Sequence, residues 1–304
     1  MDKLKGSLFA ILSAAIFGLS PIYMKYAVLY GLNVITFSTL RAVLVTLASF
    51  LVCRSLKLPV VLKGPALKET LLLCGIGSGA TGFLLALSYD YLSSGMATTI
   101  HFTYPVLVML AGVLFYKEKC SAAKVAALTL GTAAIVLFTG SPGQLNLTGV
   151  ALALASGCTY AFYTIGLGNT GVKNLHPFVV LFYSAACGAL TSLGYGLVSR
   201  TLVFETIQMP GIAIMLASIP FYSFIAAPLF QLGVRYAGPT TTAILSTTEP
   251  LVSILAGMLM LGEEMDAAKL IGCIFILVGT LVTVAAAKEP RALKTTPVPT
   301  QPNA

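Results

Sequence analysis

The stretch PVLVMLAGVLFYKEKCSAAK, residues 105–124, occurs a second time as PLVSILAGMLMLGEEMDAAK, residues 250–269. The two stretches align without a gap, and nine of the twenty positions are identical. The identical pairs are Pro105/Pro250, Leu110/Leu255, Ala111/Ala256, Gly112/Gly257, Leu114/Leu259, Glu118/Glu263, Ala122/Ala267, Ala123/Ala268 and Lys124/Lys269. A repeated apolar segment indicates two homologous halves. In a membrane protein, such halves are typical of transporters.

The composition excludes a soluble globular protein. Of the 304 residues, 57% are hydrophobic and 9% are charged, and the mean hydropathy is +0.93. A soluble domain carries about 25% charged residues, so this chain lacks the polar side chains to cover a water-exposed surface. The net charge of +8 does not indicate nucleic acid, because the basic residues lie at the ends of apolar segments. We predict an all-α polytopic membrane protein that contacts the lipid bilayer and binds no nucleic acid.

Ten segments are long and apolar enough to cross a bilayer, which takes about 20 residues. They are 6–28, 33–54, 68–90, 94–116, 122–140, 147–169, 176–199, 210–235, 239–261 and 267–287. The loops between them are short, and turn-forming Pro and Gly residues punctuate them. We therefore predict one five-helix repeat over residues 4–140, a second over 147–287, and a disordered polar tail over 288–304.

The positions of Lys and Arg predict the orientation. With the N-terminus inside, fourteen of these residues lie on the cytoplasmic side and three on the outer side, as the positive-inside rule requires. Both termini are thus expected in the cytoplasm. Because each half has five helices, the second half enters the membrane from the opposite side. The halves are therefore expected to be inverted repeats, with the substrate site near mid-membrane between them.

Several residues carry a resemblance to a known family. The repeated pattern P-x(5)-A-G-x-L-x(3)-E, the sequence SAAIFG at 13–18 and Arg41 in the second segment resemble the EamA-type domain of the drug/metabolite transporter superfamily. The resemblance covers residues 4–287 and implies a ten-helix inner-membrane carrier that exports amino acids or other small metabolites. Phe17 departs from it, because a Trp is common at that position, and Tyr160 occupies the equivalent place in the second copy.

Glu249 is the sharpest candidate for binding cargo. A charged residue at the centre of a span costs at least about 2.5–3.5 kcal/mol, so it requires a partner, a cavity or a function. The following residue, Pro250, lacks a backbone donor and disturbs the helix there. We predict that Glu249 binds a substrate ammonium group or carries a coupling proton. The alternative is a neutral glutamic acid that holds helices together.

The two copies of the repeated segment differ just before it. Tyr104 is aligned with Glu249, and His101 is aligned with Ser246. Thr98, His101 and Pro105 have the spacing of one helix face. A histidine there is suited to binding substrate or relaying protons, although a hydrogen-bonded structural histidine is equally open. We predict that the cargo is recognised at these mismatched positions.

Further candidates lie in the helices expected to face the opposite half. Arg41 is predicted to bind a substrate carboxylate, to pair with Asp90, or to extend its side chain toward the interface. Tyr160, Tyr163, Tyr222 and Gln231 are candidates for lining the site, with Ser156 on the face of the two former tyrosines, although aromatic residues at this spacing usually serve packing.

Other features are predicted to be structural. Glu118 and Glu263 are expected to favour the N-terminus of the helix that follows each, and Ser121 and Asp266 are expected to be N-caps. The six cysteines are expected to be small buried apolar residues. The sequence contains no metal-binding, cofactor-binding or catalytic motif.

These observations favour a secondary carrier that exports a small amino acid-like metabolite by alternating access, as a monomer or homodimer. A multidrug or lipophilic-cation exporter is the alternative within transport. A membrane enzyme or a receptor would require a catalytic cluster or a ligand domain, and the sequence contains neither.

Overall fold

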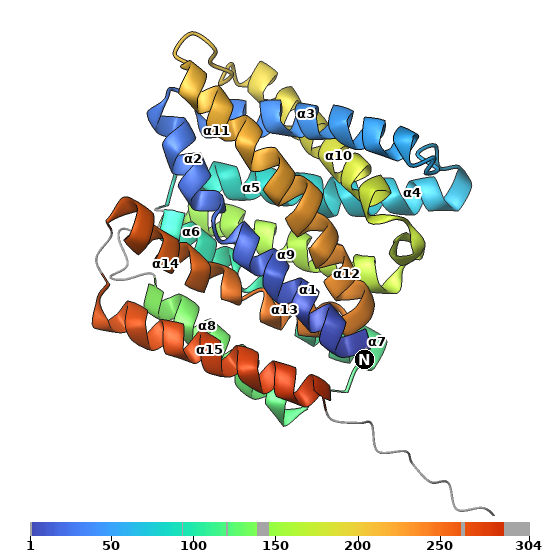
Figure 1. Ribbon diagram of the computed structural model, residues 1–304, viewed down its shortest axis with the longest axis vertical. Helices are drawn as coiled ribbons and strands as arrows, with labels where there is room; N and C mark the ends of the chain where they lie inside the picture. The colour runs from blue at the N-terminus through green and yellow to red at the C-terminus, as the bar shows by residue number, and fades with distance from the viewer. Residues whose placement is uncertain (1, 93, 120, 139–145, 263–264, 289–304) are drawn as a thin grey trace, which may run out of the picture.

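The computed structural model describes residues 2–92, 94–119, 121–138, 146–262 and 265–288, and all regular structure in these ranges is helical (Figure 1). The N-terminal half comprises α1 (Asp2–Phe17), α2 (Ser20–Leu29), α3 (Val34–Ser55), α4 (Gly64–Leu72), the π-helix η1 (Leu73–Gly79), α5 (Ala80–Ser88), α6 (Ser94–His101), α7 (Tyr104–Tyr116) and α8 (Ala122–Phe138). The C-terminal half comprises α9 (Leu147–Asn169), the 3₁₀-helix η2 (Gly171–Asn174), α10 (Pro177–Val198), α11 (Met209–Ile219), the π-helix η3 (Pro220–Ala226), α12 (Ala227–Ala237), α13 (Pro239–Leu245), α14 (Thr248–Leu261) and α15 (Ala267–Lys288).

Nine helical runs in the described part of the chain are long and apolar enough to cross a bilayer. They are Asp2–Leu29, Val34–Ser55, Gly64–Ser88, Met96–Tyr116, Leu147–Asn169, Pro177–Val198, Met209–Ala237, Pro239–Met260 and Ala267–Ala286. The predicted segment 122–140 is represented by a shorter apolar helix, Ala122–Leu137. Lys288, predicted as the start of the tail, still belongs to α15, while 289–304 lie outside the described residues.

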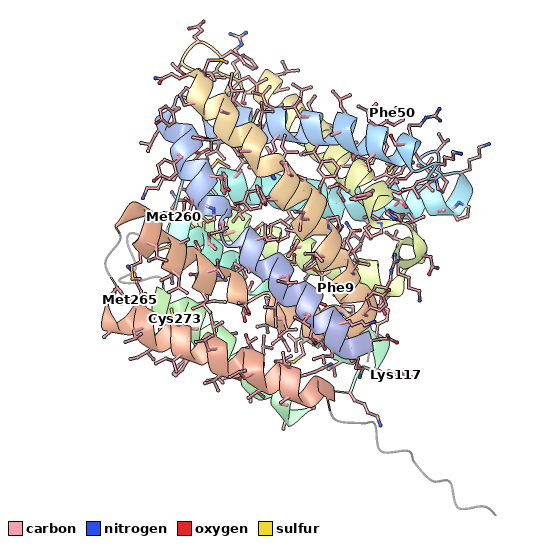
Figure 2. The ribbon with its side chains drawn as sticks, viewed as in Figure 1. Phe9, Phe50, Lys117, Met260, Met265 and Cys273 are labelled. Carbon is pink, nitrogen blue, oxygen red and sulfur yellow. The ribbon has the colours of Figure 1, made fainter. Side chains whose placement is uncertain are left out.

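The outer surface of the bundle is apolar. Phe50 in α3 and Met260 in α14 are exposed on it (Figure 2), and Leu190 in α10 keeps 74% of its surface accessible. Inside the bundle, by contrast, many buried residues are small and polar, and Ser13 of α1 donates a 2.8 Å hydrogen bond to the carbonyl of Ala226. Small residues inside and large apolar ones outside are the arrangement expected of helices packed in lipid.

The two halves pack helix against helix. α1 packs on α12, α3 on α10, α5 on α9, and α8 on α15, and each of these pairs joins the N-terminal half to the C-terminal half. We call the end of the bundle where α1 begins the near end, and the opposite end, where α3 begins, the far end (Figure 1).

The third apolar run of each half contains a π-helix. These segments, η1 and η3, are each seven residues long and lie between two α-helices. A π-helix shifts the backbone pairing to the fifth residue and is frequent at functional sites. The sequence did not predict the two π-helices, because the apolar pattern continues through both of them without a break.

The repeated segment is interrupted in both copies. α6 ends at His101 and α7 begins at Tyr104, while α13 ends at Leu245 and α14 begins at Thr248. The three residues predicted to share one helix face are therefore divided, with Thr98 and His101 in α6 and Pro105 in α7. Pro105 and Pro250 both lie in the first turn after the break, where a missing backbone N–H costs little.

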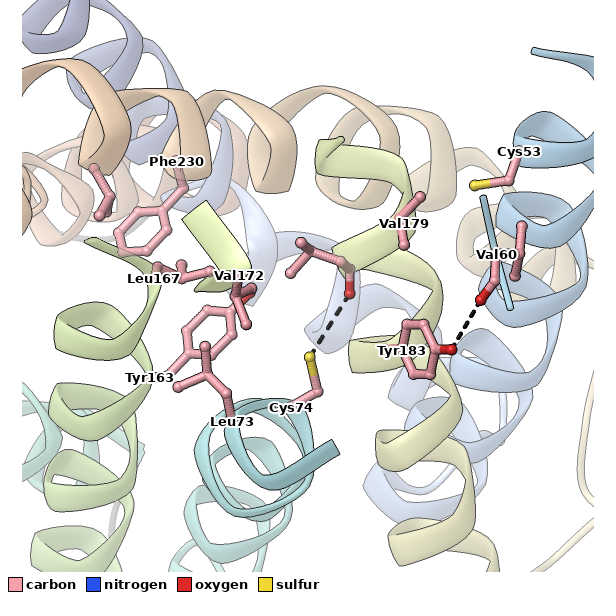
Figure 3. Close-up of a cluster of buried hydrophobic side chains, with 12 residues drawn as sticks. Cys53, Val60, Leu73, Cys74, Tyr163, Leu167, Val172, Val179, Tyr183 and Phe230 are labelled. Atoms are coloured by element: carbon pink, nitrogen blue, oxygen red, sulfur yellow. Dashed lines mark hydrogen bonds between the residues drawn. The ribbon is translucent and has the colours of Figure 1, made fainter. Parts of the chain in front are cut away.

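A cluster of buried apolar side chains fills the near end of the bundle (Figure 3). Tyr183 of α10 donates a 2.8 Å hydrogen bond to the carbonyl of Val60, and the Cys74 thiol of η1 contacts the carbonyl of Val180 at 3.9 Å. Cys53, at the end of α3, and Val172, in η2, carry the cluster to the near end. The two halves are thus tightly packed there.

Candidate functional site

A cavity of about 370 Å³ lies between the helices of the two halves. Its wall includes Val34 and Ile35 in the first turn of α3, and Tyr89 just after α5, so the cavity extends to the far end of the bundle. Its floor includes Tyr163 and Phe230, which also belong to the apolar cluster of the near end. The cavity therefore runs from the middle of the bundle toward one end and is closed by packed side chains toward the other.

A chain of polar contacts crosses the floor. The Tyr163 hydroxyl lies 3.5 Å from the Ser184 hydroxyl, and Ser184 in turn contacts the Cys74 sulfur at 3.4 Å. The Gln231 side chain is the second hydrogen-bond partner of Tyr163. Tyr163 and Gln231, both predicted from the sequence, line the cavity together with Ser184, which sequence reasoning missed.

Arg41 brings a positive charge to the cavity wall. Its guanidinium stands 6.0 Å from the centre of the Phe37 ring and lies within electrostatic reach of the Tyr222 hydroxyl. The buried Nε atom has no hydrogen-bond partner, and no carboxylate in the described part of the chain forms an ion pair with this side chain. The alternative partner suggested by the sequence, Asp90, is exposed and is not paired with Arg41.

Tyr222 stands across the cavity wall from Arg41 and comes from the π-helix η3. The ring stacks on Phe17, with centroids 6.3 Å apart and an interplanar angle of 9°, and it meets Tyr23 edge-on at 5.4 Å. The side chain is 4% exposed, and its hydroxyl oxygen is buried without a hydrogen-bond partner. Tyr222 therefore carries a buried polar group without a hydrogen-bond partner in an aromatic part of the cavity wall.

Glu249 lies in the first turn of α14 and is partly buried. Its carboxyl group is within electrostatic reach of four phenol groups, those of Tyr89, Tyr104, Tyr160 and Tyr222. Three of these tyrosines, all except Tyr104, line the cavity, although Glu249 itself does not. The carboxyl group thus stands directly behind the phenols of the cavity wall.

The other mismatched positions of the repeat gather around Glu249. Tyr104 is fully buried and is hydrogen-bonded to the Ser246 side chain. His101 contacts the Tyr104 ring at 5.5 Å, and its Nδ1 is 2.9 Å from the Ser156 hydroxyl. Neither His101 nor Ser246 lines the cavity. These residues form a buried layer behind Tyr160, whose ring lies 4.7 Å from that of Tyr104.

Glycines allow neighbouring helices to approach both breaks. A Cβ atom added at Gly18 would lie 2.6 Å from the Glu249 carbonyl oxygen, and one at Gly157 would lie 2.9 Å from the His101 carbonyl oxygen. Real Cβ atoms are not found at the first of these distances, so α1 reaches α14 this closely because residue 18 has no side chain. The position of Glu249 against the cavity depends on this contact.

Outside the cavity, Glu118 differs from the prediction. Its carboxylate forms an ion pair with Lys124 and accepts a 2.5 Å hydrogen bond from the Thr240 hydroxyl of α13. It therefore joins the two halves at the near end, in addition to preceding α8. Ser121 and Asp266 accept the expected N-cap hydrogen bonds, whereas Glu263 lies outside the described residues.

The cysteines agree with expectation except at one position. Cys53, Cys74 and Cys273 are buried and Cys187 is partly buried, but Cys158 is exposed on α9. Cys120 lies outside the described residues. Among the residues that the structure describes, no group of three or more His, Cys, Asp or Glu side chains is arranged to hold a metal ion.

Sequence reasoning also missed part of the cavity wall. Tyr89 was hidden because it falls at the end of a predicted span, where tyrosines usually mark the membrane interface. Phe230 resembled an ordinary packing residue, and its position beside Tyr160 follows from the packing of the two halves.

The apolar bundle, the helices broken in mid-span and the cavity between the two halves define a multi-pass membrane transporter. The chain belongs to the EamA-like transporter family, which matches residues 4–140 and 147–285. The family, and the two named relatives described next, are transporters and not enzymes.

Three relatives illustrate the similarity. The uncharacterized transporter YxxF of Bacillus subtilis (strain 168) is 26% identical over 218 residues, which cover 70% of this chain and 68% of that protein. The threonine/homoserine exporter RhtA of Escherichia coli (strain K12) is 23% identical over 225 residues, 74% of each chain. A protein of known crystal structure shares the fold, with a TM-score of 0.78, 14% identity, and coverage of 93% of this chain and 97% of that one.

Proposed function

We propose that this protein is a secondary carrier that exports a small amino acid-like metabolite across the inner membrane by alternating access. The observation that carries the proposal is the pair of opposite charges at the cavity. Arg41 lines the cavity and Glu249 does not, and both are within electrostatic reach of the Tyr222 hydroxyl. A zwitterion with a carboxylate and an ammonium group would complement this arrangement.

The proposed architecture has ten transmembrane helices in two inverted repeats, residues 4–140 and 147–287, with both termini in the cytoplasm. Two observations support it. The helix pair α1 and α12 has a counterpart in α9 and α5, as exchange of the two halves requires. The basic residues are also concentrated at the near end, which would be cytoplasmic. The cavity would then extend to the outer side, in an outward-facing state.

Glu249 is proposed to bind the ammonium group of the cargo or to carry a coupled proton. Removing a carboxylate from water costs several kcal/mol unless partners offset it, so the ionised side chain would bind a cationic group tightly. The position behind Tyr160 and Tyr222 would keep it from the outer solution until cargo enters.

Transport in proteoliposomes tests this proposal. Purified full-length protein is reconstituted with L-threonine, L-homoserine, L-leucine or L-phenylalanine inside, and efflux is followed at several pH values. We expect saturable efflux of at least one amino acid that Glu249→Gln abolishes or greatly slows. Normal efflux with an unchanged pH dependence in both Glu249→Gln and His101→Ala would refute the assignment of these residues.

A lipophilic-cation exporter is the second candidate, and the aromatic wall favours it. The Tyr222 ring contacts the rings of both Phe17 and Tyr23 and lies within electrostatic reach of Glu249, and cations bind both aromatic faces and carboxylates. If the protein has this function, cells that overproduce it should resist cationic dyes, and cells that overproduce Glu249→Gln should not.

A further inference from the structure

Two hydrogen-bond donors without partners belong to side chains that line the same cavity. The Arg41 Nε–H and the Tyr222 hydroxyl are both buried and lack partners among the described residues, and both side chains line the cavity wall. Most buried polar atoms in proteins are hydrogen-bonded, so an unpaired one calls for an explanation. Here two such atoms belong to side chains that lie within electrostatic reach of each other.

We infer that Arg41 and Tyr222 form a binding subsite for a carboxylate, and that this subsite makes a negatively charged group obligatory in the cargo. The inference rests on the proposed function, because it assigns a chemical class to the cargo of the same cavity. The guanidinium is planar and offers parallel donors that match the two oxygens of a carboxylate. The Tyr222 hydroxyl adds a further donor to one of these oxygens.

The position of Arg41 fits a ligand better than a structural anchor. An arginine that only extends toward the interface keeps its donors in water, whereas the Arg41 Nε is buried. A structural ion pair would require a carboxylate partner, and none of the described carboxylates provides one. The contact with Phe37, at 6.0 Å, steadies the side chain without using its hydrogen-bonding capacity.

The residues around Tyr222 indicate what the part of the ligand beside its carboxylate is like. The stacked Phe17 ring and the edge-on Tyr23 ring hold the Tyr222 phenol in one orientation, so its hydroxyl is preorganised. The Phe17 ring also lines the cavity and gives the cargo an apolar surface beside its carboxylate. A cavity of about 370 Å³ accommodates a small amino acid. A lipophilic cation, by contrast, would meet the unpaired charge of Arg41 and be repelled.

Binding measurements on purified full-length protein test the subsite separately from transport. The probes are L-threonine, L-homoserine, L-leucine and L-phenylalanine, each compared with its amide, which keeps the ammonium group and loses the negative charge. Affinities are taken from ligand-dependent thermal stabilisation. We expect the wild-type protein to bind at least one acid about 10- to 100-fold more tightly than its amide, as the loss of a charged hydrogen bond implies.

Two substitutions should remove this preference to different extents. Arg41→Met should abolish the difference between acid and amide, because it keeps an unbranched, flexible side chain and removes the charge. Tyr222→Phe keeps the stack on Phe17 and should lower the affinity for the acid by about 3- to 10-fold, the effect of one neutral hydrogen bond. Arg54→Gln in the last turn of α3 and Tyr236→Phe in α12 are exposed controls and should bind as the wild type does.

Stability without ligand separates the subsite from a structural role. If Arg41 anchors the helix, Arg41→Met should lower the midpoint of thermal unfolding. If Arg41 is instead unpaired in the absence of ligand, the midpoint of thermal unfolding of Arg41→Met should stay the same or rise, because the substitution removes a buried charge that has no partner.

The outcomes distinguish the subsite from the transport proposal. Carboxylate-dependent binding that requires Arg41, in a protein that moves none of the amino acids, supports the subsite and contradicts amino acid export. Transport of a compound without regard to its carboxylate supports a carrier and overturns the subsite. Equal binding of acid and amide by the wild type, or no binding of any acid, also overturns it. Tight binding of inorganic phosphate but of no carboxylate would overturn the assignment to a carboxylate.

Discussion

The two broken helices are interrupted in the same way, but they place different side chains in the protein interior. In the α6–α7 break, the aligned positions hold His101 and Tyr104, whose polar atoms find partners in Ser156 and Ser246. In the α13–α14 break, the position aligned with Tyr104 holds Glu249, which faces four phenol groups. The duplicated scaffold therefore supplies two aligned positions. One holds side chains whose polar atoms are hydrogen-bonded, and the other holds the carboxyl group that we propose to bind a cationic group.

The largest effect is expected from a substitution in the α13–α14 break. Glu249→Gln should lower the rate of amino acid efflux by about 10- to 100-fold, because it removes a charged partner worth about 1.5–3 kcal/mol. Wild-type efflux should slow as the pH falls, since protonation of Glu249 removes the charge that binds an ammonium group. This pH dependence should be absent in Glu249→Gln.

Tyr104→Phe is the matched control in the first helix. It removes a hydroxyl that Ser246 satisfies, and we expect efflux to retain the wild-type pH profile with only a modest loss of rate. An equal loss in Tyr104→Phe and Glu249→Gln would mean that the two breaks are functionally equivalent and that the comparison is wrong.

The next largest effect is expected on stability, from substitutions of the glycines that pack against each break. Gly18→Ala should destabilise the protein by about 1–3 kcal/mol, the usual cost of overpacking, since the added methyl would meet the Glu249 carbonyl oxygen at 2.6 Å. Gly157→Ala, whose methyl would stand 2.9 Å from the His101 carbonyl oxygen, should cost less. Thermal unfolding in detergent gives both values.

Gly82→Ala serves as the control for both glycine variants, because no atom lies within 4 Å of its added Cβ. If Gly82→Ala lowers the unfolding midpoint as much as Gly18→Ala does, helix propensity rather than close packing governs these positions.

The two copies also differ at the position that Thr240 occupies in α13, at the near end of the bundle. Thr240, in the first turn of α13, donates to Glu118, whereas the aligned residue in the first copy is Gly95, which has no hydroxyl. Thr240→Val should lower stability by about 1.5–3 kcal/mol, the range for a hydrogen bond to a charged group. The measurement is the unfolding midpoint, with Thr283→Val, which loses a bond within its own helix, as the control.

The smallest effect is expected in the satisfied break. Ser156→Ala removes the hydrogen-bond partner of His101 Nδ1 and should cost about 0.5–1.5 kcal/mol of stability. Efflux should keep its pH dependence if Glu249 carries the titrating charge, because His101 does not line the cavity. A shifted pH profile in Ser156→Ala would instead assign the proton-carrying role to His101.

The sequence predicted the scaffold well because bilayer physics leaves few choices. A chain this poor in charge must form long apolar helices, and the repeated segment placed Pro105 and Pro250 in corresponding positions. Arg41 and Glu249 were identified because an ionisable residue within a span is conspicuous in any apolar pattern.

Contacts between distant residues could not be predicted in the same way. Glu118 and Thr240 are 122 positions apart, and nothing near Glu118 indicates that its partner is in the other half. Tyr89 became part of the cavity wall only through the packing of α5 against α9. The break before Tyr104 was also missed, because neighbouring side chains and not the local pattern decide where a backbone hydrogen bond is given up.

The π-helices make the cavity depend on chain length as well as on residue type. One residue turns an α-helix by about 100°, so removing a single residue from Pro220–Ala226 would rotate α11 and α12 relative to each other by that amount. Phe230 and Gln231 would then leave the cavity wall if α11 kept its place. Relatives that differ by one residue in this segment would expose different faces to their cargo, even where the aligned residues are identical.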